Sequence, residues 1–287
     1  MIESLAGRKI LRMNGIGNEI LVLDLRGDEL TPTAAQVRAI ARQPGLYFDQ
    51  LMVVKDACVA GADASLRIYN IDGSLSAACG NGARCVALAL TRHGGPEHLR
   101  LETDAGLIET WRKSESEFAV DMGRPRLTAA EIPLALHTAD TSDVALEPAV
   151  AGAPPRFCAV SMGNPHAVFF VDDAPAVDLE NLGPQLERHP LFPERANISF
   201  AQMLARDDIL LRVWERGTGA TKACGSAACA TLVAAARTGR AGRRATVKLP
   251  GGSLSIFWRD DDHVLMTGSA ELEFETTLDP DLMGAVS

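Results

Sequence analysis

The chain has 287 residues, of which 47% are hydrophobic and 23% are charged, and its formal net charge is −9. This length allows one large domain or two of about 140 residues, and the acidic balance without a basic stripe argues against nucleic acid as a partner. No apolar run is long enough for a membrane helix and the first 13 residues lack the apolar core of a signal peptide, so we expect a cytoplasmic protein without membrane contacts.

Strand-like segments dominate the first half of the chain. Runs of aliphatic and β-branched residues predict strands at 20–25, 51–56, 65–70, 98–103 and 106–111. Thr31-Pro32 opens a predicted helix over 32–42. A second helix is expected after Cys79, where small residues lead into the Ala-rich run GNGARCVALAL.

The second half repeats this pattern. Strands are predicted at 157–162, 166–172, 197–203, 209–215, 245–249 and 253–258, and helices at 178–188 and 224–238. Many antiparallel strands with one late helix in each half favour an α+β (α/β mixed) class, in which a sheet curls around that helix. Pro and Gly near Gly123-Arg124-Pro125 place the boundary there. We expect domains at 1–125 and 126–274, with segment 275–287 completing the first.

Several polar markers recur at nearly the same distance along the chain. The pairs are Cys79 and Cys224 (145 residues apart), Gly17-Asn18 and Gly163-Asn164 (146), Tyr69-Asn70 and Trp214-Glu215 (145), and Gln50 and Asn197 (147). Two unrelated domains would rarely share this order by chance, so we infer an internal duplication. Two similar domains that face each other would bring these markers to one cleft, where we expect the active site.

Both repeated cysteines precede a helix. The positive end of the helix dipole and the unpaired N–H groups there favour negative charge, so a thiol pKa of about 8.5 can fall toward neutrality. Gly80 and Gly225 would let a carboxylate approach the backbone. Two such thiols suit a reaction in which one removes a proton from one face of a carbon and the other returns a proton to the opposite face.

The sequence disfavours other roles for its cysteines. Cys85 and Cys229 lie within the Ala-rich runs and are interpreted as small buried residues. The spacings within each run do not match structural zinc, and six helical residues rise about 9 Å, too far for a Cys79–Cys85 disulfide. The GNG sequence at 80–82 lacks the Lys-Ser/Thr ending of a phosphate loop.

Two further features gain weight from the duplication. Glu215-Arg216 stands opposite Asn70 in the repeat, which favours a functional role over a surface ion pair. His166 follows Asn164-Pro165, and its role stays open between structure and binding.

Read together, these segments resemble the diaminopimelate epimerase family over almost the whole chain. The matching motifs are MNGIGNEI (13–20), YNIDGS (69–74), ACGNGARC (78–85), GNPHAV (163–168), ERANISF (194–200) and ERGTGATKACGSAAC (215–229). The resemblance implies a PLP-independent epimerase that interconverts LL- and meso-diaminopimelate in lysine and cell-wall precursor synthesis. It also implies two similar domains, each with a sheet around a central helix, and often a homodimer, with no metal and no cofactor.

The family's site residues carry over onto matching positions. The resemblance makes Cys79 and Cys224 the acid and base, and it implies substrate contacts from Asn18, Gln50, Asn70, Gly80, Asn81, Asn164, Asn197, Glu215, Arg216, Gly225 and Ser226. In this assignment Arg216 and the asparagines hold a distal carboxylate, Glu215 an ammonium, and the helix starts the reacting carboxylate. The sequence departs from the common pattern at Asn14, Glu19-Ile20 and GLYFDQ (45–50), while Ser226 keeps the hydroxyl of the usual Thr.

Two alternatives remain at this point. One is a racemase of the same fold for another amino acid, such as histidine or proline, although Arg216 favours a substrate with a second carboxylate. The other is a non-catalytic binding or thiol redox protein, although the C-x-x-C typical of redox proteins is absent.

Overall fold

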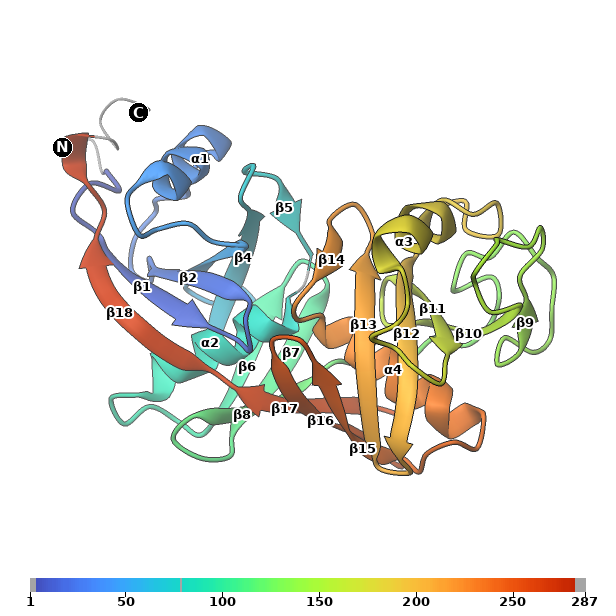
Figure 1. The fold of residues 1–287 in the computed structure, drawn as a ribbon. Helices are drawn as coiled ribbons and strands as arrows, with labels where there is room; N and C mark the ends of the chain where they lie inside the picture. Colours follow the sequence, from blue (N-terminus) through green and yellow to red (C-terminus); the bar gives the residue numbers. More distant parts are fainter. Residues whose placement is uncertain (1–3, 78, 282–287) are drawn as a thin grey trace. The chain divides into compact units, whose positions relative to one another are not determined.

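The computed structural model describes residues 4–77 and 79–281. The chain forms two compact units (Figure 1). The first unit comprises residues up to 120 together with those from 268 onward, and the second comprises residues 121–267. The chain thus enters the second unit at residue 121 and returns to the first at residue 268 for its last strand. Residues 282–287 of the expected completing segment lie outside the described residues.

The first unit is built on one sheet, in which each strand is hydrogen-bonded to the next. Its order is β18 (Glu271–Thr277), β1 (Lys9–Asn14), β2 (Glu19–Asp24), β3 (Gln50–Lys55), β4 (Ala64–Asn70), β6 (His98–Thr103), β7 (Gly106–Arg112) and β8 (Glu117–Asp121). The short β5 (Leu75–Ser76) pairs with β4. The β2–β3 and β4–β6 pairs are parallel and the other neighbours are antiparallel. Figure 1 shows β18, in red, beside the blue β1.

A helix covers each face of this sheet, and alternate side chains along a strand pack against the two helices. In β2, Ile20 and Val22 pack with residues of α2 (Gly80–Thr91) in one core cluster. Leu21 and Leu23 point to the opposite face, where they pack with α1 (Ala34–Arg42). Successive side chains of a strand point to opposite faces, so a wholly apolar strand indicates a sheet buried on both sides.

The second unit repeats this arrangement strand for strand. Its order is β9 (Val144–Ala145), β10 (Arg156–Ser161), β11 (Pro165–Phe170), β12 (Asn197–Ala205), β13 (Asp208–Glu215), β15 (Arg244–Leu249), β16 (Gly252–Trp258) and β17 (Val264–Ser269), and the short β14 (Gly219–Thr221) pairs with β13. The parallel pairs are again the corresponding ones, β11–β12 and β13–β15. Helix α4 (Gly225–Arg237) packs against strands that include β10, β11 and β16, and α3 (Leu179–Glu187) packs on the other face.

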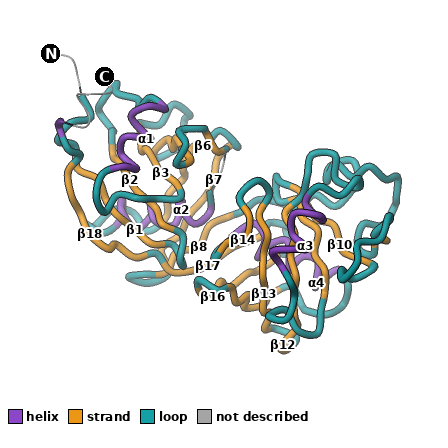
Figure 2. The backbone as a smooth tube through the Cα atoms, turned by 45° about the horizontal axis from the view of Figure 1, so that its top comes forward, coloured by secondary structure: helices purple, strands orange, loops and turns teal. Residues whose placement is uncertain are grey.

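The predicted mixed α+β class with two similar halves is confirmed. Figure 2 shows the strands in orange and the helices in purple. The long helices begin within two residues of their predicted starts, and α1 begins after Thr33, whose side chain forms a capping box with Gln36. The strand ranges predicted from the sequence do not include β1, β8, β17, β18 or the two- or three-residue strands. Among residues 4–77 and 79–281, no helix is long and apolar enough to cross a membrane.

Candidate functional site

The predicted site residues of the first unit gather around the N-terminus of α2. We call this group the first cysteine cluster: Asn18, Gln50, Asn70, Cys79, Gly80 and Asn81. Cys79 is the N-cap residue of α2, with extended backbone, and Gly80 and Asn81 open its first turn. The sulfur accepts a hydrogen bond from the Gly82 backbone N–H at 3.3 Å, which is how an N-cap side chain pairs an orphan donor.

Two amide side chains reach the Cys79 sulfur. Gln50 Oε1 lies 3.5 Å from Sγ and Asn18 Oδ1 lies 4.0 Å from it. Both oxygens can accept the proton of a thiol. They belong to neighbouring strands, because Gln50 is the first residue of β3 and Asn18 precedes β2.

Strand register brings Asn70 to the same place. Gln50 pairs with Asn70 across the antiparallel β3–β4 ladder and with Ile20 across the parallel β2–β3 ladder. The Asn70 amide donates to Ser74 Oγ at 3.0 Å. Three separate segments therefore deliver amide groups to the start of one helix.

Tight packing fixes that helix start. A Cβ at Gly82 would come within 2.5 Å of Met52 Sδ, and one at Gly15 would come within 3.2 Å of the Asn81 carbonyl oxygen. Asn81 itself is buried, and its Oδ1 has no hydrogen-bond partner among the described residues. An unpaired buried polar atom is costly, so this oxygen is a natural contact for a bound donor.

A matching second cysteine cluster surrounds the N-terminus of α4. It consists of Asn164, Asn197, Glu215, Arg216, Cys224, Gly225 and Ser226. Cys224 is the N-cap residue of α4 and is only 5% exposed. Its sulfur lies 3.6 Å from Ser226 Oγ, which accepts a hydrogen bond from the Asn164 amide at 3.3 Å.

His166, whose role the sequence left open, supports Asn164. The imidazole is fully buried, and its Nε2 lies 2.9 Å from Asn164 Oδ1. Burial lowers the pKa of His166 to about 3, and the nearby Arg216 charge adds to this. The ring is therefore neutral near pH 7 and, with its proton on Nε2, donates to the Asn164 carbonyl.

Asn197 anchors the segment that carries Glu215 and Arg216. The Asn197 carbonyl accepts from the Arg216 backbone N–H at 3.0 Å, and its amide donates to Pro165 O at 3.0 Å. The Arg216 guanidinium donates to Glu194 O at 3.1 Å, while the Glu215 carboxylate accepts from the Thr221 hydroxyl.

Glu187, absent from the sequence prediction, holds the same segment from α3. Its side chain is buried, and it accepts hydrogen bonds from Trp214 Nε1 at 2.7 Å and from the Gly217 N–H at 3.0 Å. Arg195 lies 3.6 Å from the carboxylate. An acidic residue near a helix end is common on protein surfaces, so only the fold reveals that this one is buried beneath the Glu215-Arg216 turn.

The expected fall in thiol pKa is not found at Cys224. Burial raises the pKa of Cys224 well above its usual value, and the Glu215 charge raises it further, against smaller lowering effects of Ser226 and the Ala227 N–H. Desolvation of the thiolate thus outweighs the effect of the helix terminus on the Cys224 pKa. Cys85 and Cys229 are completely buried as predicted, and burial raises the pKa of Cys85 to about 12.

The departures from the common family pattern have local explanations. Asn14 Oδ1 accepts from the Gly17 N–H at 2.7 Å, and Glu19 pairs with Arg12 at 2.8 Å. Phe48 belongs to the core cluster beneath α1, whereas Tyr47 is 57% exposed.

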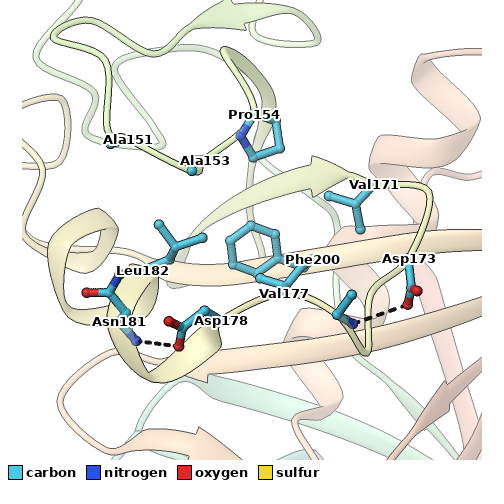
Figure 3. Close-up of a pocket in the computed structure, with 12 residues that line it drawn as sticks. Ala151, Ala153, Pro154, Val171, Asp173, Val177, Asp178, Asn181, Leu182 and Phe200 are labelled. Atoms are coloured by element: carbon cyan, nitrogen blue, oxygen red, sulfur yellow. Dashed lines mark hydrogen bonds between the residues drawn. The ribbon is translucent and has the colours of Figure 1, made fainter.

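A separate hollow of about 680 Å³ lies beside α3 in the second unit (Figure 3). Apolar side chains such as Leu182 and Phe200 line it, together with Asp173 and Asp178, whose carboxylates accept backbone hydrogen bonds from Ala176 and Asn181. It contains none of the predicted site residues. In the described part of the chain, no group of three or more His, Cys, Asp or Glu residues is placed to hold a metal ion.

The two-unit fold is found in several solved structures. The chain matches a putative phenazine biosynthesis protein from Clostridium difficile with a TM-score of 0.70 and 14% identity, over 95% of this chain and 99% of that one. It matches a probable proline racemase from Agrobacterium radiobacter with a TM-score of 0.64 and 16% identity, over 94% and 92% of the two chains. These likenesses show the fold class of the chain.

Sequence comparison defines the family within this class. A family model described as diaminopimelate epimerase matches residues 10–128 and 158–273. A diaminopimelate epimerase from Methylocella silvestris is 58% identical over 282 residues, covering 97% of each chain. The chain belongs to the diaminopimelate epimerase family, a family of isomerases, which confirms the resemblance seen in its motifs.

Proposed function

We propose that the chain interconverts LL- and meso-diaminopimelate without PLP, in the synthesis of lysine and cell-wall precursors. Cys79 and Cys224 exchange the α-proton, one as thiolate and the other as thiol. The observation that carries the proposal is the equivalent placement of these residues in a member of this family. Each is the N-cap residue of the central helix of its unit, and each has a polar side chain beside its sulfur.

The surroundings of Cys224 suggest how substrate prepares the thiol. The Glu215 charge is one cause of the raised pKa of Cys224. A substrate ammonium bound by Glu215 would neutralise this charge and lower the cost of forming the thiolate. The ammonium on the reacting carbon is therefore the better partner for Glu215, and the α-proton beside it becomes accessible to the sulfur.

The helix starts supply the rest of the chemistry. Proton loss from the α-carbon drives negative charge onto the adjacent carboxylate, and the first-turn N–H groups around Gly80-Asn81 and Gly225-Ser226 can stabilise that charge. Arg216, with Asn18, Asn70, Asn164 and Asn197, can hold the distal ammonium and carboxylate groups of the substrate.

The wider assignments belong to the same proposal. The substrate is a small amino acid, a homodimer is a possible assembly, and no nucleic acid, membrane or cofactor takes part. A lysine precursor is made in the cytoplasm, where we place the chain.

The test is epimerisation in deuterated water with purified protein and no added PLP. We expect deuterium at the substrate α-carbon, and loss of turnover in Cys79→Ala and in Cys224→Ala. Cys58→Ala is the matched control, because Cys58 is an exposed free thiol outside both clusters. Wild-type turnover in either cluster variant, or equal activity on histidine or proline, would contradict the proposal.

A further inference from the structure

Asp49 lies beside the first cysteine cluster without belonging to it. Its Oδ2 accepts two hydrogen bonds, from Asn18 Nδ2 at 2.7 Å and from the Glu19 N–H at 2.8 Å. Its own N–H donates to Glu19 O at 2.8 Å. One carboxylate oxygen therefore links the start of β2 to the start of β3 and holds the Asn18 side chain by a hydrogen bond.

The hydrogen bond to Asp49 determines the orientation of the Asn18 side-chain amide. A carboxylate only accepts hydrogen bonds, so Asn18 must turn its NH₂ group toward Asp49. Its carbonyl oxygen then points the other way, and this oxygen lies 4.0 Å from Cys79 Sγ. Without an acceptor at position 49, the amide could rotate by half a turn and present its NH₂ group to the sulfur.

The second unit shows that the duplicated fold does not itself need this carboxylate. Ile20 pairs with Gln50 as His166 pairs with Asn197, so Ala196 occupies the position that matches Asp49. Ala196 is fully buried. Asn164 is turned the opposite way from Asn18, with its carbonyl toward His166 and its NH₂ toward Ser226.

We propose that Asp49 is a positioning residue, which holds Asn18 with its carbonyl oxygen toward Cys79 and so favours the protonated, proton-donating form of that thiol. A carbonyl beside sulfur stabilises S–H and disfavours S⁻. Because the matching Asn164 has the opposite orientation, the two cysteines stand in different hydrogen-bonding surroundings. This inference rests on the proposed two-thiol mechanism for its consequence, but its geometry lies within the first unit.

The test measures Cys79 ionisation without substrate. Unliganded protein is alkylated with iodoacetamide over a range of pH, and the Cys79 peptide is quantified by mass spectrometry. In Asp49→Ala the pH midpoint of Cys79 alkylation should fall by about half a unit, the size expected for one weak hydrogen bond. Asp49→Asn should keep the wild-type midpoint, since its Oδ1 can accept both bonds.

Repeating the substitution in an Asn18→Ala variant distinguishes an effect through Asn18 from a general destabilisation of the fold. In Asn18→Ala the midpoint should already be lowered, and adding Asp49→Ala should change it no further. A shift that persists in the Asn18→Ala background, or an unchanged midpoint in Asp49→Ala, would overturn the inference. Asp49→Ser, whose hydroxyl is too short to reach Asn18, takes the place of the alanine variant if that variant does not fold.

Turnover distinguishes this inference from the proposed function. We expect a lower kcat in Asp49→Ala and a near wild-type kcat in Asp49→Asn. If Cys79→Ala abolishes turnover but Asp49→Ala leaves the pH midpoint of Cys79 alkylation unchanged, this inference fails and the proposed function stands. If Cys79→Ala keeps turnover, the proposed function fails whatever the alkylation shows.

Discussion

Gly183 of α3 lies directly against the indole of Trp214, and a Cβ at position 183 would come within 2.3 Å of Trp214 Cδ2. The indole cannot move aside freely, because its Nε1 donates to the buried Glu187 carboxylate. A helical glycine normally costs about 1 kcal/mol relative to alanine. Here the close approach requires it, and the requirement leads to the first prediction.

Gly183→Ala should destabilise the protein. Overpacking typically costs about 1–3 kcal/mol, and the close approach to a hydrogen-bonded ring places this variant in the upper part of that range, above the roughly 1 kcal/mol that alanine gains in helix propensity. We expect a net loss of about 1–2 kcal/mol in the free energy of unfolding, measured with urea. Gly242→Ala is the control, since no atom lies within 4 Å of a Cβ there. Equal stabilities of the two variants would contradict this packing argument.

Glu187→Gln should loosen the turn that carries Glu215 and Arg216. Trp214 Nε1 and the Gly217 N–H donate to different oxygens of Glu187, and an amide offers one oxygen, so one bond becomes a clash between donors. We expect a loss of about 1–3 kcal/mol in stability and a raised KM for diaminopimelate. Glu180→Gln, an exposed site on the same helix, is the control. An unchanged KM would separate this turn from substrate binding.

His166 should contribute to the loss of stability in acid. Its pKa is 6.5 when unperturbed and about 3 in the folded protein, so between these values the unfolded state binds more protons than the folded state. Stability is therefore lost as pH falls below about 6.5 and continues to fall toward about 3. His166→Gln should lose less stability between neutral pH and pH of about 4.5, by about 2 kcal/mol.

The measurement for His166 is urea unfolding at both pH values. The difference between pH values should be smaller in His166→Gln than in wild type. His137→Gln, at an exposed histidine, should retain the wild-type difference. Parallel behaviour of the two histidine variants would show that His166 titrates normally in the folded protein.

Glu215→Gln should lower the pKa of Cys224. The Glu215 charge raises that pKa, whereas burial, the larger cause, remains in the variant. Alkylation of the Cys224 peptide should therefore begin at lower pH than in wild type, but still above the range of an exposed thiol. Turnover should nevertheless fall, because the ammonium partner is lost. An unchanged alkylation profile would indicate that Glu215 does not act on the sulfur.

The sequence predicted most of this fold because its signals were local. Apolar runs marked the buried strands, and the 145-residue spacing of Cys79 and Cys224 revealed the duplication. The observed strand orders of the two units agree one for one. The placement of amide groups around each cysteine also follows from the repeat, because Gln50 and Asn197 open corresponding strands.

The features that were not predicted from the sequence depend on contacts between residues far apart in the chain. Strand β18 is rich in acidic residues, and its pairing with β1 joins residues more than 250 positions apart. The raised pKa of Cys224 depends on burial, which a helix-start pattern does not reveal. Asp49 adjoins Gln50 in the chain, but its bond to Asn18 bridges 31 positions.

The pairing of β18 with β1 also sets an order of assembly during synthesis. The second unit is one continuous segment, residues 121–267, so its sheet can form while the rest of the chain is still being translated. Most of the first unit is translated earlier, but one edge of its strand β1 stays unpaired until residues 271–277 are made, because these residues form β18. A chain that stops short of them would leave that edge open to pairing with other chains.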